Sequence, residues 1–322
     1  MRLQLLVGGH MPRTESLPEG LRPRSGASWE DQALAYETFC REVIDVVAPL
    51  VPACKPQAAF FEQLGPAGMT ALKRVIDHAR AKGLLVIVDG KRNDIGSTAT
   101  AYAQGFLGAN SAWGADALTV SPYLGDDSLT PFVDVCTEQQ AGIFVLVKTS
   151  NPGGKTFQDL SAMQSATASA PAEFSAWETI SVSCHDAAAS AEAMSPLYRH
   201  VAAHVEALAA KTAGTCGYGA VGAVVGATYP RQLVELRAAM PHTWLLVPGY
   251  GSQGGTARDV AAAFDAQGLG GIVNNSRGII FAHARKEYAE RFGAPRWQEA
   301  VEAATHEMID ELQAECPAFR SP

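Results

Sequence analysis

Three charged residues stand close together in the segment VIVDGKRNDIGST, in the order Asp89, Lys91 and Asp94. They follow the aliphatic run Leu84–Val88, which predicts a strand buried on both faces, so Asp89 is expected where that strand meets solvent. If the backbone stays extended, Asp89 and Lys91 point to the same side, while Asp94 returns from the loop or from the first turn of the next helix. This pattern places one cation between two anions.

The chemistry that such a cluster can do is proton donation. Opposite unit charges about 4 Å apart attract by about 4 kcal/mol at an effective dielectric constant near 20, so Lys91 is expected to stay protonated. A protonated lysine positioned by carboxylates is a general acid. The alternative is a salt bridge at the end of a strand with no chemical role.

Eight short aliphatic runs recur along the chain, between longer alanine-rich stretches of helical character. They are Leu3–Gly8, Ala53–Gln57, Leu84–Val88, Ala117–Val120, Gly142–Val147, Ala220–Gly226, Trp244–Val247 and Gly271–Asn274. The alternation is typical of parallel strands joined by helices, and eight such units favour a (β/α)8 barrel, an α/β fold whose chemistry lies at the carboxyl ends of its strands. A doubly wound open sheet competes with it, but no Gly-x-Gly-x-x-Gly turn follows the first run.

Polar or glycine-rich residues follow each of the later runs. Gln253 comes after the seventh run and Arg277 after the eighth, and the loops at these two places form the phosphate site in many barrels. Arginine can bind a phosphate through two parallel hydrogen bonds, and glycines such as Gly251 let backbone N–H groups approach it. A helix-capping or surface role is the alternative for Arg277.

Composition narrows the class of protein. The chain has 322 residues, of which 47% are hydrophobic and 18% charged, which fits a large globular core, here interpreted as a single domain over residues 1–322. A net charge of −8 argues against nucleic acid as the main partner. No apolar run reaches the roughly 18 residues of a membrane span, and the scattered cysteines suggest neither disulfides nor a metal site, so we expect a cytoplasmic protein.

Two regions lie outside the strand-and-helix alternation. Residues of about 157–195 are rich in Ala, Ser and Thr without clear periodicity, which indicates an insertion after the fifth strand, and a lid over the active site is one role for it. Its Cys184 and His185 are adjacent rather than at metal-ligand spacing. Residues Pro295 to Gln313 carry apolar side chains at helical spacing and predict a helix that closes the barrel.

Seven segments together resemble a known family, that of orotidine 5′-phosphate decarboxylase in its longer bacterial subgroup. The matching segments are CKPQAAFFEQLG at 54–65, DGKRNDIGSTATAYA at 89–103, PYLGDDSLTPF at 122–132, FVLVKTSNPGG at 144–154, GAVVGATYP at 222–230, VPGYGSQGG at 247–255 and NNSRGIIFA at 274–282. This resemblance implies decarboxylation of orotidine 5′-phosphate to uridine 5′-phosphate (UMP), the last step of de novo pyrimidine nucleotide biosynthesis, with no metal and no cofactor.

The resemblance also implies roles for individual residues. Catalysis would fall to the charged array Lys55, Asp89, Lys91 and Asp94, with Lys91 stabilising a carbanion at C6 and then protonating it. Asp94 would enter the site from a neighbouring subunit, together with Ile95 and Thr98, so a homodimer with shared active sites is implied. Substrate binding would involve Ser150 and more weakly Thr228 near the pyrimidine, with Gln253, Gly251 and Arg277 at the phosphate.

The chain departs from the family pattern after its first run. Family members carry an aspartate in a Gly-x-Asp-Pro turn there, whereas this chain reads Gly9-His10-Met11-Pro12, so Met11 replaces a ribose contact. Losing a hydrogen bond to a hydroxyl commonly costs about 0.5–1.5 kcal/mol, so turnover is expected to be weakened rather than abolished. Two alternatives remain open, a related metal-dependent sugar-phosphate decarboxylase and a catalytically weakened barrel that binds UMP.

Overall fold

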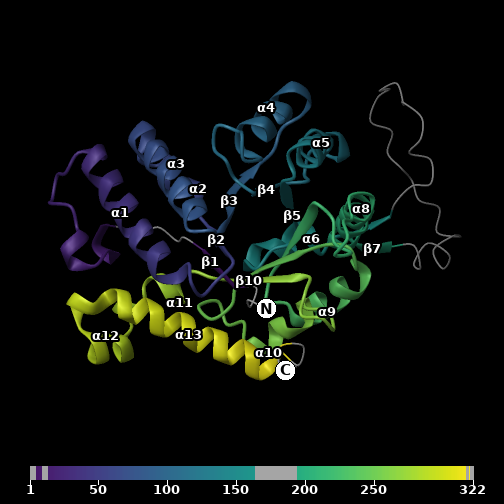
Figure 1. Cartoon of the computed structure of the whole chain (residues 1–322). Coiled ribbons are helices and arrows are strands. Elements are labelled where there is room, and N and C mark those ends of the chain that lie inside the picture. The colour runs from purple at the N-terminus through teal and green to yellow at the C-terminus, as the bar shows by residue number, and fades with distance from the viewer. Residues whose placement is uncertain (1–4, 9–13, 164–193, 317–318, 320–322) are drawn as a thin grey trace, which may run out of the picture.

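The computed structural model describes residues 5–8, 14–163, 194–316 and 319. In it, eight parallel strands close into a barrel in the order β1-β10-β9-β8-β5-β4-β3-β2 (Figure 1). These strands are β1 (Leu5–Gly8), β2 (Ala53–Lys55), β3 (Leu85–Arg92), β4 (Ala117–Val120), β5 (Gly142–Lys148), β8 (Val221–Val225), β9 (Leu245–Pro248) and β10 (Gly271–Asn275). The (β/α)8 barrel expected from the sequence is confirmed.

Helices surround the strands and cover the outer surface of the barrel (Figure 1). They are α1 (Trp29–Val47), α2 (Ala58–Glu62), α3 (Gly65–Ala81), α4 (Gly96–Phe106), α5 (Thr130–Gln139), α6 (Lys155–Gln158), α8 (Leu197–Lys211), α9 (Pro230–Ala239), α10 (Ala257–Val260), α11 (Arg277–Ile280), α12 (Lys286–Phe292) and α13 (Trp297–Glu315). Short 3-10 helices occupy 14–16, 19–21, 126–128, 152–154, 261–263, 282–284 and 294–296. Among the described helices, none is long and apolar enough to cross a membrane.

The side chains inside the barrel form a cluster of their own. Its buried members are Ala53, Ile87, Ala117, Phe144, Val224 and Leu246, whereas the strand residues on either side of Ile87 belong to the larger core under the helices. Since side chains alternate along a strand, the residues two positions beyond Ala53, Ile87 and Ala117 face the interior as well. Those residues are Lys55, Asp89 and Thr119, and they lie at the carboxyl end of the barrel.

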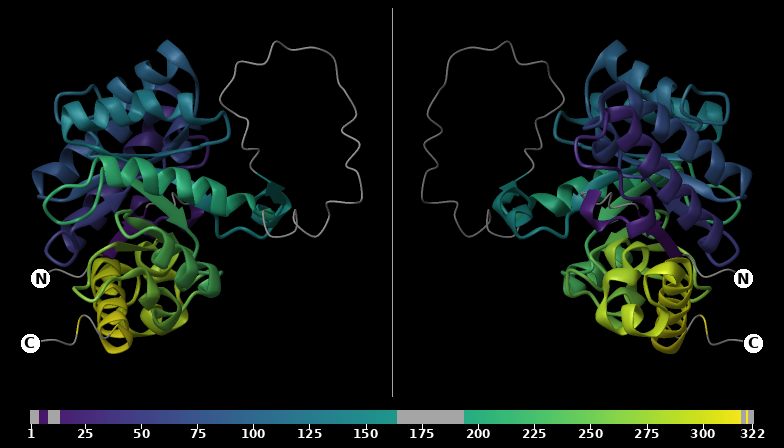
Figure 2. Two further views of the ribbon diagram at one scale, coloured as in Figure 1. Left: turned by 90° about the vertical axis from the view of Figure 1, so that its right-hand side faces the viewer. Right: turned by 90° about the vertical axis from the view of Figure 1, so that its left-hand side faces the viewer.

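The last helix closes the fold as the sequence predicted, with bounds shifted by two residues. Helix α13 packs against α1 and α12, and Figure 2 shows α12 and α13 together at one side of the molecule. Its apolar positions Trp297, Val301, Met308 and Leu312 are buried. The helical periodicity of these residues therefore identified the face that packs on the barrel.

The region predicted as an insertion departs from the barrel through a small separate sheet. Strand β6 (Ser161–Met163) pairs antiparallel with β7 (Met194–Pro196), and α8 starts directly after β7. Residues 164–193, which include Cys184 and His185, lie outside the described residues, as does the segment with His10 and Met11. The described cysteines form no disulfide bond.

Candidate active site

Asp89 lies inside the end of the barrel rather than at the solvent boundary expected from the sequence. Strand β3 continues past Val88 to Arg92, and its register with β4 shifts between these two residues. The N–H group of Asp89 donates to the carbonyl of Pro56 (2.9 Å), and Gln57 Nε2 donates to the carbonyl of Asp89 (3.0 Å). Asp89 is therefore fixed from both sides and only 7% exposed.

The expected extended backbone does not persist to Lys91, whose φ is +43°. This left-handed conformation costs a non-glycine residue about 1–2 kcal/mol, so something must hold it. The N–H group of Lys91 donates to Thr119 Oγ1 (2.9 Å), and Thr119 Oγ1 donates to Asp89 Oδ1 (3.0 Å). Lys91 Nζ turns back to the same carboxylate oxygen at 2.5 Å, while 48% of the lysine side chain stays exposed.

Thr119 was not among the residues singled out from the sequence. Its side chain is 1% exposed, and its hydroxyl joins the backbone of Lys91 to the carboxylate of Asp89. The available signal was a hydroxyl residue at an inward position of β4, a strand that is otherwise apolar. Threonine is common in strands for its branched shape alone, so that signal is weak.

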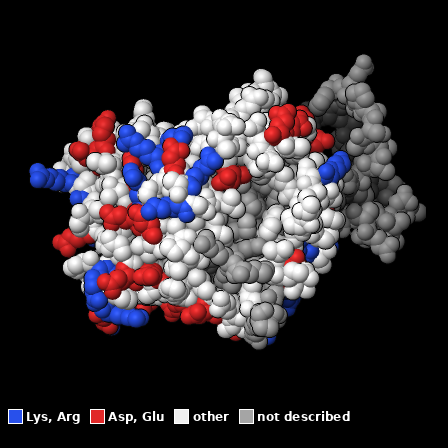
Figure 3. Space-filling view, viewed as in Figure 1, with Lys and Arg blue, Asp and Glu red and all other residues white. Residues whose placement is uncertain are grey.

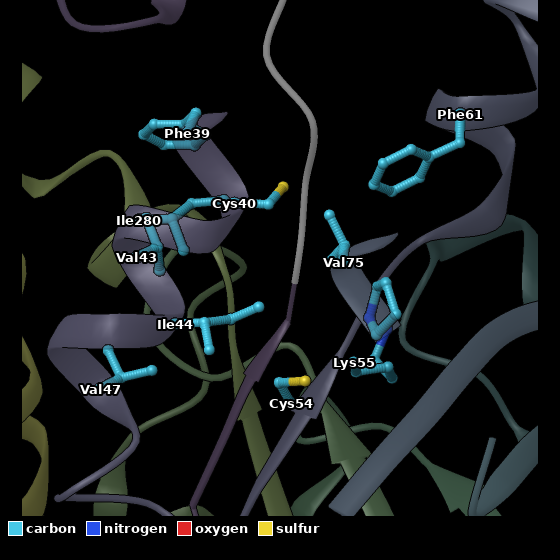
Figure 4. Close-up of a pocket in the computed structure, with 11 residues that line it drawn as sticks. Phe39, Cys40, Val43, Ile44, Val47, Cys54, Lys55, Phe61, Val75 and Ile280 are labelled. Carbon is cyan, nitrogen blue, oxygen red and sulfur yellow. The ribbon is translucent and has the colours of Figure 1, made fainter. Parts of the chain in front are cut away.

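Lys55 approaches Asp89 from the other side and forms an ion pair with Asp89 Oδ2. Apolar side chains of α1, α2 and α3, among them Val43, Phe61 and Val75, line a pocket beside Lys55 (Figure 4). Burial lowers the pKa of Lys55, and the attraction of Asp89 opposes that effect. Burial alone would raise the pKa of Asp89, but the charges of Lys55 and Lys91 outweigh it and hold this pKa well below its usual value.

The third charged residue of the motif points elsewhere within this chain. Asp94 Oδ1 accepts a hydrogen bond from the N–H group of Ile95 (2.8 Å), and no ion pair joins Asp94 to Lys91 across the described part of the chain. Ile95 is 52% exposed, and Thr98 on the first turns of α4 is exposed too. Ile95 and Thr98 therefore present their side chains to solvent, while the described hydrogen bond of Asp94 stays within its own loop.

Ser150, Thr228 and Gln253 come together around Gly249 from three different loops. A Cβ atom added to Gly249 would lie 3.2 Å from Ser150 Cβ, 3.4 Å from Gln253 Oε1 and 3.5 Å from Thr228 Cγ2. Thr228 Oγ1 also donates to the carbonyl of Ser150 (3.0 Å). The loops after β5, β8 and β9 thus bring three predicted substrate-binding residues into one cluster.

Arg277 and Gly251 lie in a second cluster, in a pocket that Tyr250, Asn275 and Met308 also line. Arg277 is exposed and forms no ion pair with any described residue, so its guanidinium is available to an anion. The N–H groups of Gly251, Gly254 and Gly255 donate to carbonyls of their own loop in this conformation. The glycines thus shape the turn, with a φ of +66° at Gly251 and +95° at Gly254.

The polar side-chain groups of the Lys55, Asp89, Lys91 and Thr119 cluster are ammonium, carboxylate and hydroxyl groups. Within residues 5–8, 14–163, 194–316 and 319, no three His, Cys, Asp or Glu side chains gather where they could hold a metal ion. Basic and acidic side chains are interspersed on the face shown in Figure 3 rather than gathered in one positive surface. Both the Lys55–Asp89–Lys91 cluster and Arg277 carry cationic groups that suit a small anionic ligand.

Comparison with known proteins gives one consistent result. Residues 33–292 match the model of the orotidine 5′-phosphate decarboxylase / HUMPS family. The chain is 54% identical over 307 residues to the orotidine 5′-phosphate decarboxylase of Rhodopirellula baltica, covering 94% of this chain and 92% of the relative. It is 39% identical over 285 residues to the enzyme of Deinococcus radiodurans, covering 88% and 90%. The solved OMP decarboxylase of Leishmania donovani matches with a TM-score of 0.66 at 31% identity, covering 98% of this chain and 94% of that structure.

Proposed function

Because the chain belongs to the orotidine 5′-phosphate decarboxylase family, we propose that it removes CO2 from orotidine 5′-phosphate and releases UMP. One observation carries this proposal most directly. The Lys91 ammonium is half-exposed at the carboxyl end of the barrel and is held 2.5 Å from Asp89 Oδ1. A fixed cation at an open site is the group needed where negative charge develops on a substrate carbon.

The reaction breaks the bond between C6 and the carboxylate carbon of the substrate. The bonding electrons stay on C6, whose lone pair conjugates poorly with the ring carbonyls, and CO2 leaves. Lys91 stabilises this charge and then transfers a proton from its ammonium to C6, after which the neutral amine regains a proton from water. Asp89 holds Lys91 in place through one carboxylate oxygen and pairs with Lys55 through the other.

The substrate-binding residues divide along the nucleotide. In our proposal, Ser150 contacts the pyrimidine edge with Thr228 beside it, Lys55 contacts the ribose, and Arg277 binds the phosphate with Gln253 and Gly251. The convergence of Ser150, Thr228 and Gln253 on Gly249 supports a single binding surface. The free guanidinium of Arg277 supports an anion site at the other end.

We further propose a homodimer in which each site borrows residues 94–98 from the partner. The exposure of Ile95 and Thr98 supports the idea, and so does the lack of an ion pair between Asp94 and Lys91 among the residues that the structure describes. Two strongly exposed apolar side chains of the adjacent loop, Tyr123 and Leu124, add apolar surface that a partner could cover. Charged nucleotides as substrate and product and the absence of disulfides among the described cysteines fit a cytoplasmic enzyme.

The direct test is a spectrophotometric assay of orotidine 5′-phosphate loss by the purified protein, run with and without EDTA. We expect turnover that the chelator does not change. Activity that appears only with Mg²⁺ and a sugar phosphate would replace our proposal with the related metal-dependent decarboxylase. UMP binding without turnover would instead identify a catalytically silent barrel.

A further inference from the structure

Lys148, the last residue of β5, is a buried cation that the proposed chemistry does not use. Its side chain is 0% exposed and forms an ion pair with Asp159. The ammonium lies 4.5 Å from the ring centroid of Tyr229 and 5.4 Å from that of Tyr198. Taking an ammonium out of water costs several kcal/mol, and apolar replacements of buried ion pairs are often neutral or stabilising. Stability of the barrel is therefore a poor explanation for this lysine.

The ion pair closes the loop that leaves β5. Lys148 stands before the loop and Asp159 stands at its far end, just after α6. The next residue at each end of the loop is paired as well. Gln158 Oε1 accepts a hydrogen bond from the N–H group of Thr149 (3.0 Å), and Gln158 Nε2 donates one to Thr149 Oγ1 (2.8 Å). The two paired ends fix the loop that carries Ser150.

One of the two rings around Lys148, that of Tyr229, connects to the same loop. The hydroxyl of Tyr229 donates to the carbonyl of Asn151 (3.4 Å), the residue directly after Ser150. On the other side of the loop, Gly226 donates its N–H to the carbonyl of Lys148 (2.7 Å), and a Cβ on Gly226 would lie only 2.6 Å from Ser150 Cα. Ser150 is thus held between the loop contacts of Lys148 and Tyr229 on one side and the backbone of Gly226 on the other.

We propose that Lys148 is a positioning residue, whose buried charge, paired with Asp159 between two tyrosine rings, fixes Ser150 against the base of the bound nucleotide. Lys148 thereby sets the affinity for the pyrimidine and leaves the affinity for the phosphate unchanged. This inference rests on the proposed function. The inference concerns how the enzyme binds the base, a role that we do not assign to any residue of the Lys55–Asp89–Lys91 cluster.

The test compares UMP with ribose 5-phosphate, which keeps the ribose and phosphate but lacks the base. Calorimetric titration of Lys148→Met, which keeps the length and apolar stem, is expected to show UMP binding weakened by about tenfold, the value of one lost hydrogen bond. Ribose 5-phosphate binding should stay within about twofold. Ser150→Ala should give the same pattern, and adding it to Lys148→Met should cause no further loss, because both changes remove one contact.

Asp159→Asn provides the matched variant at the exposed end of the ion pair and replaces Lys148→Met if that protein does not fold. Unchanged UMP affinity, or equal weakening of both ligands, would overturn the inference and leave Lys148 a structural residue. Fully additive losses from Lys148→Met and Ser150→Ala would do the same. A wild-type protein that binds no UMP would refute the proposed function itself, which is a different result from a variant that binds it normally.

Discussion

Thr119→Val removes the hydroxyl that joins Asp89 to Lys91 and keeps the shape of the side chain. The change deletes a hydrogen bond of 3.0 Å to a carboxylate and one of 2.9 Å from a backbone N–H group. The first is worth about 1.5–3 kcal/mol and the second about 0.5–1.5 kcal/mol, and water cannot replace them because Thr119 is 1% exposed. Their combined loss, about 2–4.5 kcal/mol, is at least as large as the cost of the left-handed backbone that they hold at Lys91, which is about 1–2 kcal/mol.

We therefore expect Lys91 to lose its fixed position. If about half of that free energy falls on the transition state, kcat drops roughly five- to fortyfold, since each factor of ten corresponds to about 1.4 kcal/mol. KM should change little, because the hydroxyl of Thr119 is hydrogen-bonded to Asp89 and Lys91, which are not the residues that we propose to bind the base and the phosphate. Steady-state kinetics of orotidine 5′-phosphate loss measures both quantities.

Two further variants make the measurement decisive. Thr119→Ser restores the hydroxyl and should recover most of kcat. Thr305→Val removes a buried hydroxyl of α13 that donates to the carbonyl of Val301, so it reports the cost of such a change where neither Asp89 nor Lys91 is the partner. A Thr119→Val enzyme with kcat within about twofold of wild type would refute the idea that Thr119 holds Lys91, because the lost hydrogen bonds would then carry no catalytic consequence.

Four other predictions follow from the site. Lys91→Ala should abolish turnover while UMP still binds in calorimetry, and retained turnover would contradict its role as proton donor. Arg277→Ala should weaken UMP affinity by about 1.5–3 kcal/mol, and unchanged affinity would remove Arg277 from the phosphate site. Because the pKa of Asp89 is lowered in the folded protein, its charge adds stability above the unfolded pKa near 3.9, and this contribution is lost as pH falls through the folded pKa. Urea titrations should thus show wild type and Asp89→Asn converging in free energy of unfolding as pH falls below about 4, and a constant difference would contradict this linkage. Co-expressed Lys91→Ala and Asp94→Asn chains should recover about a quarter of wild-type activity, since half of the dimers are mixed and each mixed dimer rebuilds one site, whereas no recovery would argue against shared sites.

The recurrence of short aliphatic runs along the sequence was enough to predict the strands of the barrel. The run Ala117–Val120 has the same bounds as β4, and the other seven runs each overlap a strand of the barrel. The prediction failed at β3, where Asp89, Gly90 and Lys91 look like the start of a loop although the strand continues to Arg92. A local pattern cannot reveal a shift in register, because that shift depends on the neighbouring strand β4.

The proximity of three charged residues of the candidate site was predictable from the sequence, but their geometry was not. Lys55, Asp89 and Lys91 were selected together, and the structure brings them into contact. The left-handed backbone at Lys91 was not foreseen, since such a conformation is rare for residues other than glycine. Thr119 and Lys148 escaped notice because their importance comes from partners distant in sequence, Asp89 for one and two tyrosine rings for the other.

The pairing of β6 with β7 bears on how much the length of the intervening segment can change. Met163 stands opposite Met194, so the chain departs from the barrel and returns to it at neighbouring points. Doubling the length of a segment closed in this way costs only about 0.6 kcal/mol of chain entropy. A change in the length of the segment between β6 and β7 should therefore cost the barrel little, whereas a residue added beside Lys91 would shift the N–H group that donates to Thr119.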